Sequence, residues 1–454
     1  MNQLMIKQFL RTRTFQFGLI LILLLGLISI ITGRQFLNDQ RERISHVVEK
    51  QEGHIARNIE FHGDDLGLLL YYLKFSLVKK QSPLVALSIG QNDLNPSIQS
   101  VKILALEGQK YDTDLVNPTK LLFGNLDFSF ILVYVFPLLI IAFTYNLLSE
   151  EEESGTWKMV SVTVQSKLKF LLSKLLVRLI SLLAVMSFLF IAASLVLDIP
   201  WNEAFFAFYM IGVLYQVFWF AICFWVICLK RNSSFNAVVL LFFWLMLVVL
   251  LPAVVNNAVT NRYPVPEALT TMIKQRDGYH QKWDTNKRET LVKFYKSYPQ
   301  FESFGFPPEE GFNWLWYYAM QHLGDDESVE ESKAMASKII EREEMSKQIG
   351  QFFPSMYALL TFNELAETSL VDHMSFLERT NKFHEDTRLY FYPKIFSEST
   401  ADDVEWEKFK PKFYEGRNQS FSWTGLLPLA SVILFFIGLS AFMYRRNFVS
   451  IAND

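Results

Sequence analysis

Six long stretches of apolar residues run along the chain, and polar or charged segments separate them. A helix needs about 20 apolar residues to cross the hydrocarbon core of a bilayer, and these stretches meet or approach that length. The first stretch follows basic residues, as a signal peptide would, but it lacks a small-residue cleavage site and continues into Gly33-Arg34-Gln35. We therefore predict six membrane-spanning helices, at residues 15–32, 128–148, 170–197, 204–229, 237–255 and 423–444.

Basic residues near the span ends predict the orientation, because short basic loops stay in the cytoplasm. The short loop at residues 198–203 carries no lysine or arginine, whereas the opposite side is rich in both. Both termini, including the tail at residues 445–454, are therefore predicted to be cytoplasmic. The basic residues on that side are Lys7, Arg11, Arg13, Lys158, Lys167, Lys169, Lys174, Arg178, Lys230, Arg231, Arg445 and Arg446.

Two long segments, residues 33–127 and 256–422, then lie outside the membrane. In the first, residues 35–61 are predicted to continue the first spanning helix, and residues 83–90 and 100–106 to form strands on either side of a turn. The second is predicted to be mostly helical, including an amphipathic helix at residues 328–353. The expected fold is a mainly α polytopic membrane protein with a small mixed α/β domain and a larger helical domain outside the membrane.

Composition supports a membrane protein and excludes several other classes. Of the 454 residues, 51% are hydrophobic and 20% charged, and the net charge of -3 gives no reason to expect nucleic acid as a partner. Cys223 and Cys228 lie in one apolar stretch, where they are expected to be small core residues rather than a disulfide or a metal site.

The chain lacks the motifs of the common catalytic sites. No P-loop string, H-E-x-x-H, G-x-S-x-G or C-x-x-C occurs, so we expect no enzymatic activity and no ATP hydrolysis by this chain itself. His46, His54 and His62 recur every eight residues, a spacing that spreads them around a helix. They are therefore expected to be solvated side chains, and no metal site or directly bound cofactor is predicted.

The cytoplasmic segment at residues 149–169 is unusual. Four adjacent carboxylates, which repel one another and anionic lipid, are followed by a break at Ser154-Gly155. Residues 156–164 can then form a short surface helix with Trp157, Met159 and Val160 partly exposed; the alternative is a solvated loop. The candidate site residues are Glu150, Glu151, Glu152, Glu153, Gly155, Thr156, Trp157 and Lys158. Residues 1–14 form a second amphipathic segment of the kind that lies at a membrane surface.

Several strings resemble the ABC-type-2 permeases, the membrane subunits of ABC exporters. They are Asn117-Pro118 through Gly124, Asp127, Pro137-Leu-Leu-Ile-Ile141 and the Glu-Glu-Ser-Gly-Thr turn followed by Trp157-Lys-Met-Val160. Phe353-Pro354-Ser355 and residues 363–369 resemble the branch with a large domain between the last two spans, although Glu367 stands where that branch implies glycine.

The resemblance implies an N-terminal elbow helix at residues 1–14, six spans and a coupling helix at residues 149–169 that meets a separate ATPase. It also implies ABC ATPase subunits as partners, ATP used only through them, and a second permease that makes a homodimer or a heterodimer. The expected location is the bacterial inner membrane. An alternative function is a membrane-anchored scaffold or sensor that binds an envelope protein without transport.

The spans also bear on the cargo, which the sequence does not identify. No ionisable residue lies in the cores of the six spans, which argues against an ion-coupled carrier and favours a lipid-facing or hydrophobic route. Their few polar residues, among them Ser187, Tyr215 and Gln216, are expected to make interhelical hydrogen bonds. In the second outer segment, five aromatic residues at positions 312–318 cannot all face one stripe. At least one or two of them are therefore expected to be exposed or to face the other outer domain, a second permease or an envelope protein.

Overall fold

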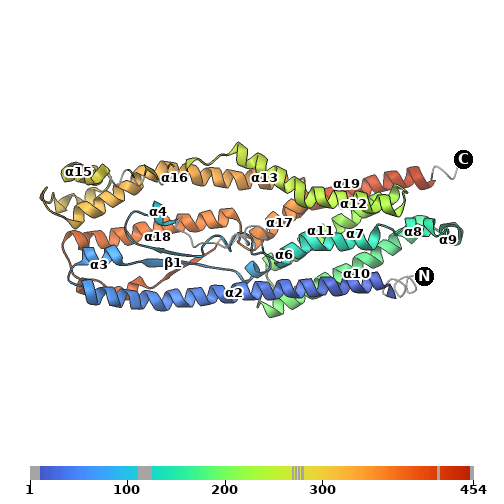
Figure 1. The fold of residues 1–454 in the computed structure, drawn as a ribbon, viewed down its shortest axis with the longest axis horizontal. Helices are drawn as coiled ribbons and strands as arrows, with labels where there is room; N and C mark the ends of the chain where they lie inside the picture. Colours follow the sequence, from blue (N-terminus) through green and yellow to red (C-terminus); the bar gives the residue numbers. More distant parts are fainter. Residues whose placement is uncertain are drawn as a thin grey trace.

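The computed structural model describes residues 11–110, 125–267, 270, 273–274, 277, 281–416 and 420–449. The molecule is elongated and mostly helical, and the start of α2 and the end of α19 lie at the same end of it (Figure 1). That end is a bundle of apolar helices. The other end is a second body, which we call the distal domain; it contains the far half of α2 together with α3, α15, α16 and α18.

The bundle contains six helices that are long and apolar enough to cross a membrane, as predicted. Five of the predicted spans lie within one or two residues of these helices or inside them, and the first lies inside a 50-residue helix. That helix, α2, continues well beyond the predicted span, as expected for residues 35–61. The six candidate spans are Arg13–His62 (α2), Phe128–Glu153 (α6 to α8), Lys167–Val196 (α10), Glu203–Cys228 (α11), Ser233–Arg262 (α12 to α13) and Trp423–Phe448 (α19 with its flanking turns).

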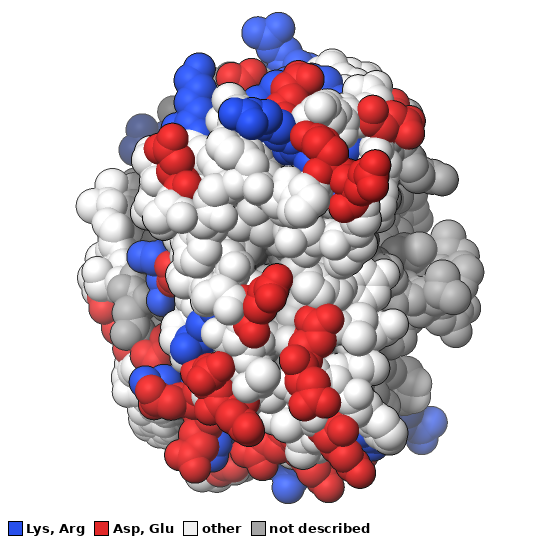
Figure 2. All heavy atoms as spheres, turned by 90° about the vertical axis from the view of Figure 1, so that its left-hand side faces the viewer, with Lys and Arg blue, Asp and Glu red and all other residues white. Residues whose placement is uncertain are grey.

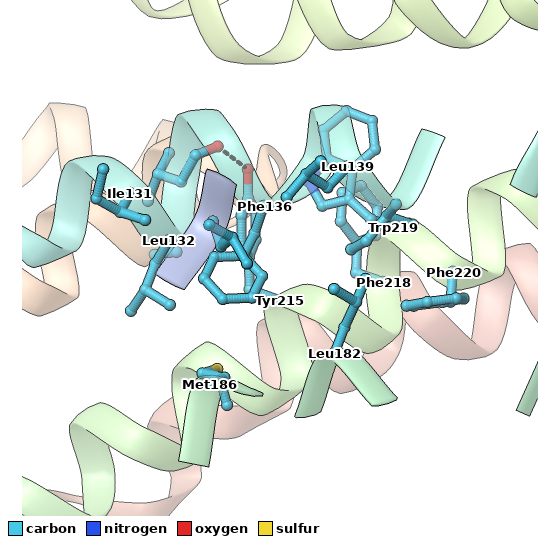
Figure 3. Packing of buried hydrophobic residues seen from close by; sticks show 14 of the residues in the cluster. Ile131, Leu132, Phe136, Leu139, Leu182, Met186, Tyr215, Phe218, Trp219 and Phe220 are labelled. Carbon is cyan, nitrogen blue, oxygen red and sulfur yellow. Dashed lines mark hydrogen bonds between the residues drawn. The ribbon is translucent and has the colours of Figure 1, made fainter. Parts of the chain in front are cut away.

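Two of these spans contain a π-helical turn immediately before a proline. In the second span, η2 (Ile131–Val135) precedes α7 (Phe136–Thr144), whose second residue is Pro137. A proline has no backbone N–H, so the carbonyl of Val133 loses its ordinary partner four residues later. The hydroxyl of Tyr215, on α11, donates to that carbonyl at 3.0 Å (Figure 3). The fifth span repeats the pattern, with η3 (Met246–Leu250) before α13 (Leu251–Arg262) and its Pro252.

Polar residues within the spans contact neighbouring helices, as predicted. The Oγ of Ser187 lies 2.7 Å from the Oη of Tyr209, which joins α10 to α11. The amide nitrogen of Gln216 lies 2.9 Å from the sulfur of Met186. In Figure 3 the side chain of Tyr215 lies among rings and branched aliphatic groups such as Phe136, Phe218 and Leu132.

One helix from the second outer segment packs into the bundle. It is α17 (Pro354–Leu365), whose Phe362 stacks on Phe208 of α11 with ring centroids 4.2 Å apart. The hydroxyl of Ser355 lies 3.0 Å from the hydroxyl oxygen of Tyr215, within hydrogen-bonding distance. Tyr215 lies twelve residues inside α11, roughly 18 Å from that helix's first residue. The second outer segment therefore reaches deep between the spanning helices.

The distal domain is built from both outer segments. A three-stranded sheet in the order β2-β1-β3 joins them: β2 (Ile98–Val101) is antiparallel to β1 (Phe75–Lys80), and β3 (Lys412–Glu415) is parallel to it. The two predicted outer domains therefore fold together as one body. Its helices are α3 (Leu66–Tyr72), α4 (Glu107–Lys110), α15 (Lys287–Ser297), α16 (Trp314–Gly350) and α18 (Leu370–Phe396), with 3-10 turns at Pro83–Ala86, Pro299–Phe304, Ala401–Asp403 and Trp406–Phe409.

One predicted strand is wrong, and another is shifted. Residues 83–86 form a 3-10 turn instead of the start of a strand, because Pro83 fixes the first φ and the Ser82 hydroxyl accepts from the N–H of Leu84. The strand predicted at residues 100–106 overlaps β2 only at its first two residues. Strand β1 was not predicted because its lysines interrupt the apolar run, yet Lys79 is buried and its ammonium donates to the carbonyl of Glu367.

The aromatic cluster at positions 312–318 is split between core and surface, as expected. Trp316, Tyr317 and Tyr318 are buried in the core of the distal domain, Trp314 is half-buried, and Phe312 is exposed. The amphipathic helix predicted at residues 328–353 is the second half of α16. Glu367 has a φ of 57°, the left-handed conformation that favours the glycine implied by the resemblance.

A buried ion pair joins three parts of the distal domain. Arg388 of α18 donates from Nη1 to Asp325 of α16 at 2.8 Å, and Asp325 also accepts from the backbone N–H groups of Leu106 and Glu107. Burial raises the pKa of Asp325 to about 6, against the opposing effects of Arg388 and these two N–H groups. The adjacent His322 is buried, and burial followed by the charge of Arg388 lowers its pKa to about 2.

Candidate functional site: the α8–α9 segment

The segment between the second and third candidate spans forms two short helices with a sharp turn. Helix α8 is Ser149–Glu153 and helix α9 is Trp157–Thr163, in agreement with the predicted break and surface helix. Gly155 has a φ of 79°, a left-handed conformation that costs glycine nothing and lets α9 turn back along the bundle end. Ser166 then caps α10 by accepting from the N–H of Lys169. Both helices lie at the end of the bundle where α2 starts and α19 ends (Figure 1).

The carboxylates of α8 bind to neighbouring elements rather than only to water. Glu151 lies 2.5 Å from the ammonium of Lys174 on α10, and it also accepts from the hydroxyl of Thr156. Glu153 accepts from both the N–H and the hydroxyl of Ser233, at 2.8 and 3.0 Å. Because Ser233 is the first residue of α12, the acidic turn connects the starts of two spans.

The remaining members of the predicted site lie at the surface. Glu150 is exposed and accepts from the side-chain amide of Asn146 at 2.9 Å, within the same span. Glu152 is half-buried, whereas Thr156 and Lys158 are exposed. The structure therefore brings the eight predicted residues together on one turn, with Glu151 and Glu153 facing the bundle.

Helix α9 has an inner and an outer apolar face. Trp157 is half-buried, and its ring lies against Phe170 of α10 with centroids 6.4 Å apart. On the other face, the side chain of Met159 is 68% exposed and that of Val162 is 86% exposed. Helix α9 thus packs on the bundle through Trp157 and leaves an apolar face open, and another protein can bind to such a face. Among the described residues, no group of three or more His, Cys, Asp or Glu side chains could hold a metal ion.

Sequence reasoning did not identify Lys174, Ser233 or Val162 as members of this site. Lys174 and Ser233 lie 23 and 80 residues from their partners, and no local pattern connects them. Helical spacing could have identified Val162, because Met159 and Val162 are three residues apart and therefore lie on one face of a helix. Two other predicted features, most of the elbow helix at residues 1–14 and the string at residues 117–124, lie outside the described residues.

Comparison with known proteins gives a match only within the second outer segment. Residues 269–414 match a family described as a domain of unknown function (DUF3526), a region that includes α15 to α18 and β3. The α8–α9 segment and all six candidate spans lie outside this match. No curated protein and no solved structure matches the chain.

Proposed function

We propose that the chain is the membrane subunit of an ATP-driven exporter and that a separate ATPase binds at the α8–α9 segment. The observation that carries this proposal is the exposed apolar face of α9, Met159 and Val162, on a helix whose other face is attached to the bundle. An ATPase that changes conformation can move the spanning helices only through a segment that packs on them. A loop without such contacts would move without displacing the helices.

The contacts of the segment define a path for that movement. A displacement of α9 acts on α10 through Trp157 and Phe170, and a displacement of α8 acts on α10 and α12 through Lys174 and Ser233. Helix α8 also continues the second span, whose π-helical turn is hydrogen-bonded to Tyr215. Tyr215 in turn contacts Ser355 of α17, which leads into the distal domain. ATP binding at the α8–α9 end of the molecule can thus shift α17 and the distal domain at the opposite end.

The proposed complex contains two ATPases and two permeases, which are either identical or similar. Its location is the bacterial inner membrane, with the α8–α9 end in the cytoplasm and the distal domain outside. The positive-inside rule supports this orientation: lysines and arginines cluster at the α8–α9 end, and the loop at residues 198–203 carries none. The cargo is not identified; the apolar bundle fits a hydrophobic molecule better than an ion.

Single-cysteine labelling tests the orientation. Glu60→Cys and Lys333→Cys on the distal domain are expected to react with a membrane-impermeant thiol reagent in intact spheroplasts, whereas Ser154→Cys should react only after lysis. All three positions are exposed, so access to the reagent depends on the side of the membrane alone. Cys223 and Cys228 are buried and provide a low background. Labelling of Ser154→Cys alone in intact cells would reverse the orientation.

Substitution on the outer face of α9 tests the docking surface. Met159→Glu combined with Val162→Glu should weaken ATPase binding by about 2–4 kcal/mol, because it places two charges in an apolar contact. Binding is measured by co-purification and by the ATPase activity of the complex. Trp157→Glu is a less specific variant, because it would also disturb the packing on Phe170.

Gln165→Glu is the matched control, since Gln165 is exposed beside α9 and its replacement adds charge without removing an apolar group. The control should retain the ATPase. If the ATPase co-purifies equally with the unmodified chain, the Met159→Glu/Val162→Glu variant and the Gln165→Glu control, α9 is not the docking surface. If no ATPase accompanies the unmodified chain, the scaffold function becomes the better explanation.

A further inference from the structure

A positively charged groove lies on the distal domain between α2 and the sheet. It has a volume of about 670 Å³, and His46, His54 and two hydroxyl-bearing serines line it together with three basic side chains. The volume falls in the range of small-molecule sites. The basic side chains are those of Lys50, Arg57 and Lys74.

The positive charges of the groove are not neutralised by the protein. Within the part of the chain that the structure describes, Lys50, Arg57 and Lys74 form no ion pair, and Glu49 is the only acidic residue in the lining. Lysines nearby behave differently: Lys80 and Lys410 pair with Glu415 and Glu52. Burial lowers the pKa of Lys102, and the neighbouring charge of Lys74 lowers it further. The lining therefore carries a net positive charge, with three basic side chains against one carboxylate.

The floor of the groove is polar and held in place. The Oγ atoms of Ser76 and Ser100 lie 2.8 Å apart, and since their mutual bond uses one hydroxyl hydrogen, the other can be donated to a ligand. Gln51 fixes this floor: its side chain accepts from the N–H of Ser76 at 3.0 Å and donates to the carbonyl of Phe409 at 2.7 Å.

The spacing of the cations indicates the size of the ligand. Lys50 and Arg57 are seven residues apart on α2, about two helical turns, so they lie on one face roughly 10 Å apart. Residue 50 also lies eighteen residues beyond the predicted first span, roughly 27 Å along the helix. At this distance from the end of the first span, the groove lies beyond the reach of a lipid headgroup in the bilayer.

We propose that this groove binds a soluble polyanion, a molecule that carries two or more phosphate or carboxylate groups. The cations contact the charged groups at both ends of the groove, and the serine hydroxyl donates to a group between them. The site is independent of the proposed ATPase contact, so either proposal can fail without the other.

Calorimetric titration of the detergent-purified full chain with inorganic triphosphate tests the site. The unmodified chain should bind triphosphate at low ionic strength. Each replacement, Lys50→Gln, Arg57→Gln or Lys74→Gln, should weaken binding about tenfold, and the triple variant by about 100-fold or more. The matched control is a triple variant of paired surface lysines, Lys80→Gln, Lys293→Gln and Lys408→Gln, which removes the same charge elsewhere and should bind normally.

Three results would overturn the proposal. They are the absence of triphosphate binding to the unmodified chain, equal binding by the groove variant, and an equal loss in the control variant. The last result would mean that binding follows net charge only. Reconstitution into nanodiscs separates a soluble ligand from a lipid: triphosphate affinity should be the same in zwitterionic and anionic phospholipid, whereas competition by anionic lipid would assign the groove to a lipid headgroup.

Discussion

Replacing Arg388 with methionine is expected to destabilise the distal domain by about 3–5 kcal/mol, because the substitution leaves the carboxylate of Asp325 buried without its cation. The side chains of Arg388 and Asp325 are only 6% and 9% exposed, so water cannot replace the lost partner. Burial alone would lower the pKa of Arg388, but Tyr392, Asp325 and Glu385 raise it above its usual range. The guanidinium is therefore charged at every physiological pH.

The loss should spread beyond α18, because Asp325 also holds residues 106 and 107 by their N–H groups. We expect proteolysis to begin in this segment at a lower temperature than in the unmodified protein, and thermal unfolding of the distal domain to occur earlier. Limited proteolysis at increasing temperature, followed by mass spectrometry, measures both effects.

Arg379→Met is the control for the loss of an arginine from the same helix, since Arg379 is exposed. Its effect should stay within about 0.5 kcal/mol. Adding Asp325→Asn to Arg388→Met should recover part of the stability, because the buried charge is then removed with its partner. Equal destabilisation by Arg379→Met and Arg388→Met would contradict a structural role for the buried pair.

The spanning helices could be predicted because the bilayer imposes a local requirement. Each needs a run of apolar residues of a certain length, and such a run is visible without knowledge of the rest of the chain. The same reasoning also placed the end of α2, because residues 35–61 were predicted to continue the first span, but it ended the fifth span at residue 255, whereas that helix continues to Arg262. It also missed α17, whose short apolar face packs against α11 about 140 residues earlier in the sequence.

In the distal domain and the candidate site, too, local features could be predicted, whereas contacts between distant parts of the chain could not. The acidic turn and Gly155 are local features, so the shape of the α8–α9 segment could be predicted. The residues that hold it, Lys174 and Ser233, become neighbours only when the bundle forms. The pairing of β1 with β3 was missed for the same reason, since the two strands are more than 300 residues apart and β1 contains lysines.

The close packing of α2 against the chain at residues 83–86 leads to the last prediction, which compares two glycines of the same helix. Gly33 lies where α2 passes the 3-10 turn, and a Cβ at this position would lie 2.3 Å from the carbonyl oxygen of Ala86. That oxygen belongs to the backbone of a buried turn and cannot rotate away. Gly33→Ala should therefore destabilise the folded protein by about 1–3 kcal/mol, because helix and turn must separate.

Gly53 gives the matched comparison, since a Cβ there meets nothing within 4 Å. Gly53→Ala should stabilise the protein by about 0.5–1 kcal/mol, because alanine loses less backbone entropy than glycine when a helix forms. The two variants carry the same chemical change on one helix and should shift the thermal unfolding midpoint in opposite directions. If both variants shift it upward, α2 does not press against the turn at Ala86, and the junction between the bundle and the distal domain is looser than the contact at Gly33 requires.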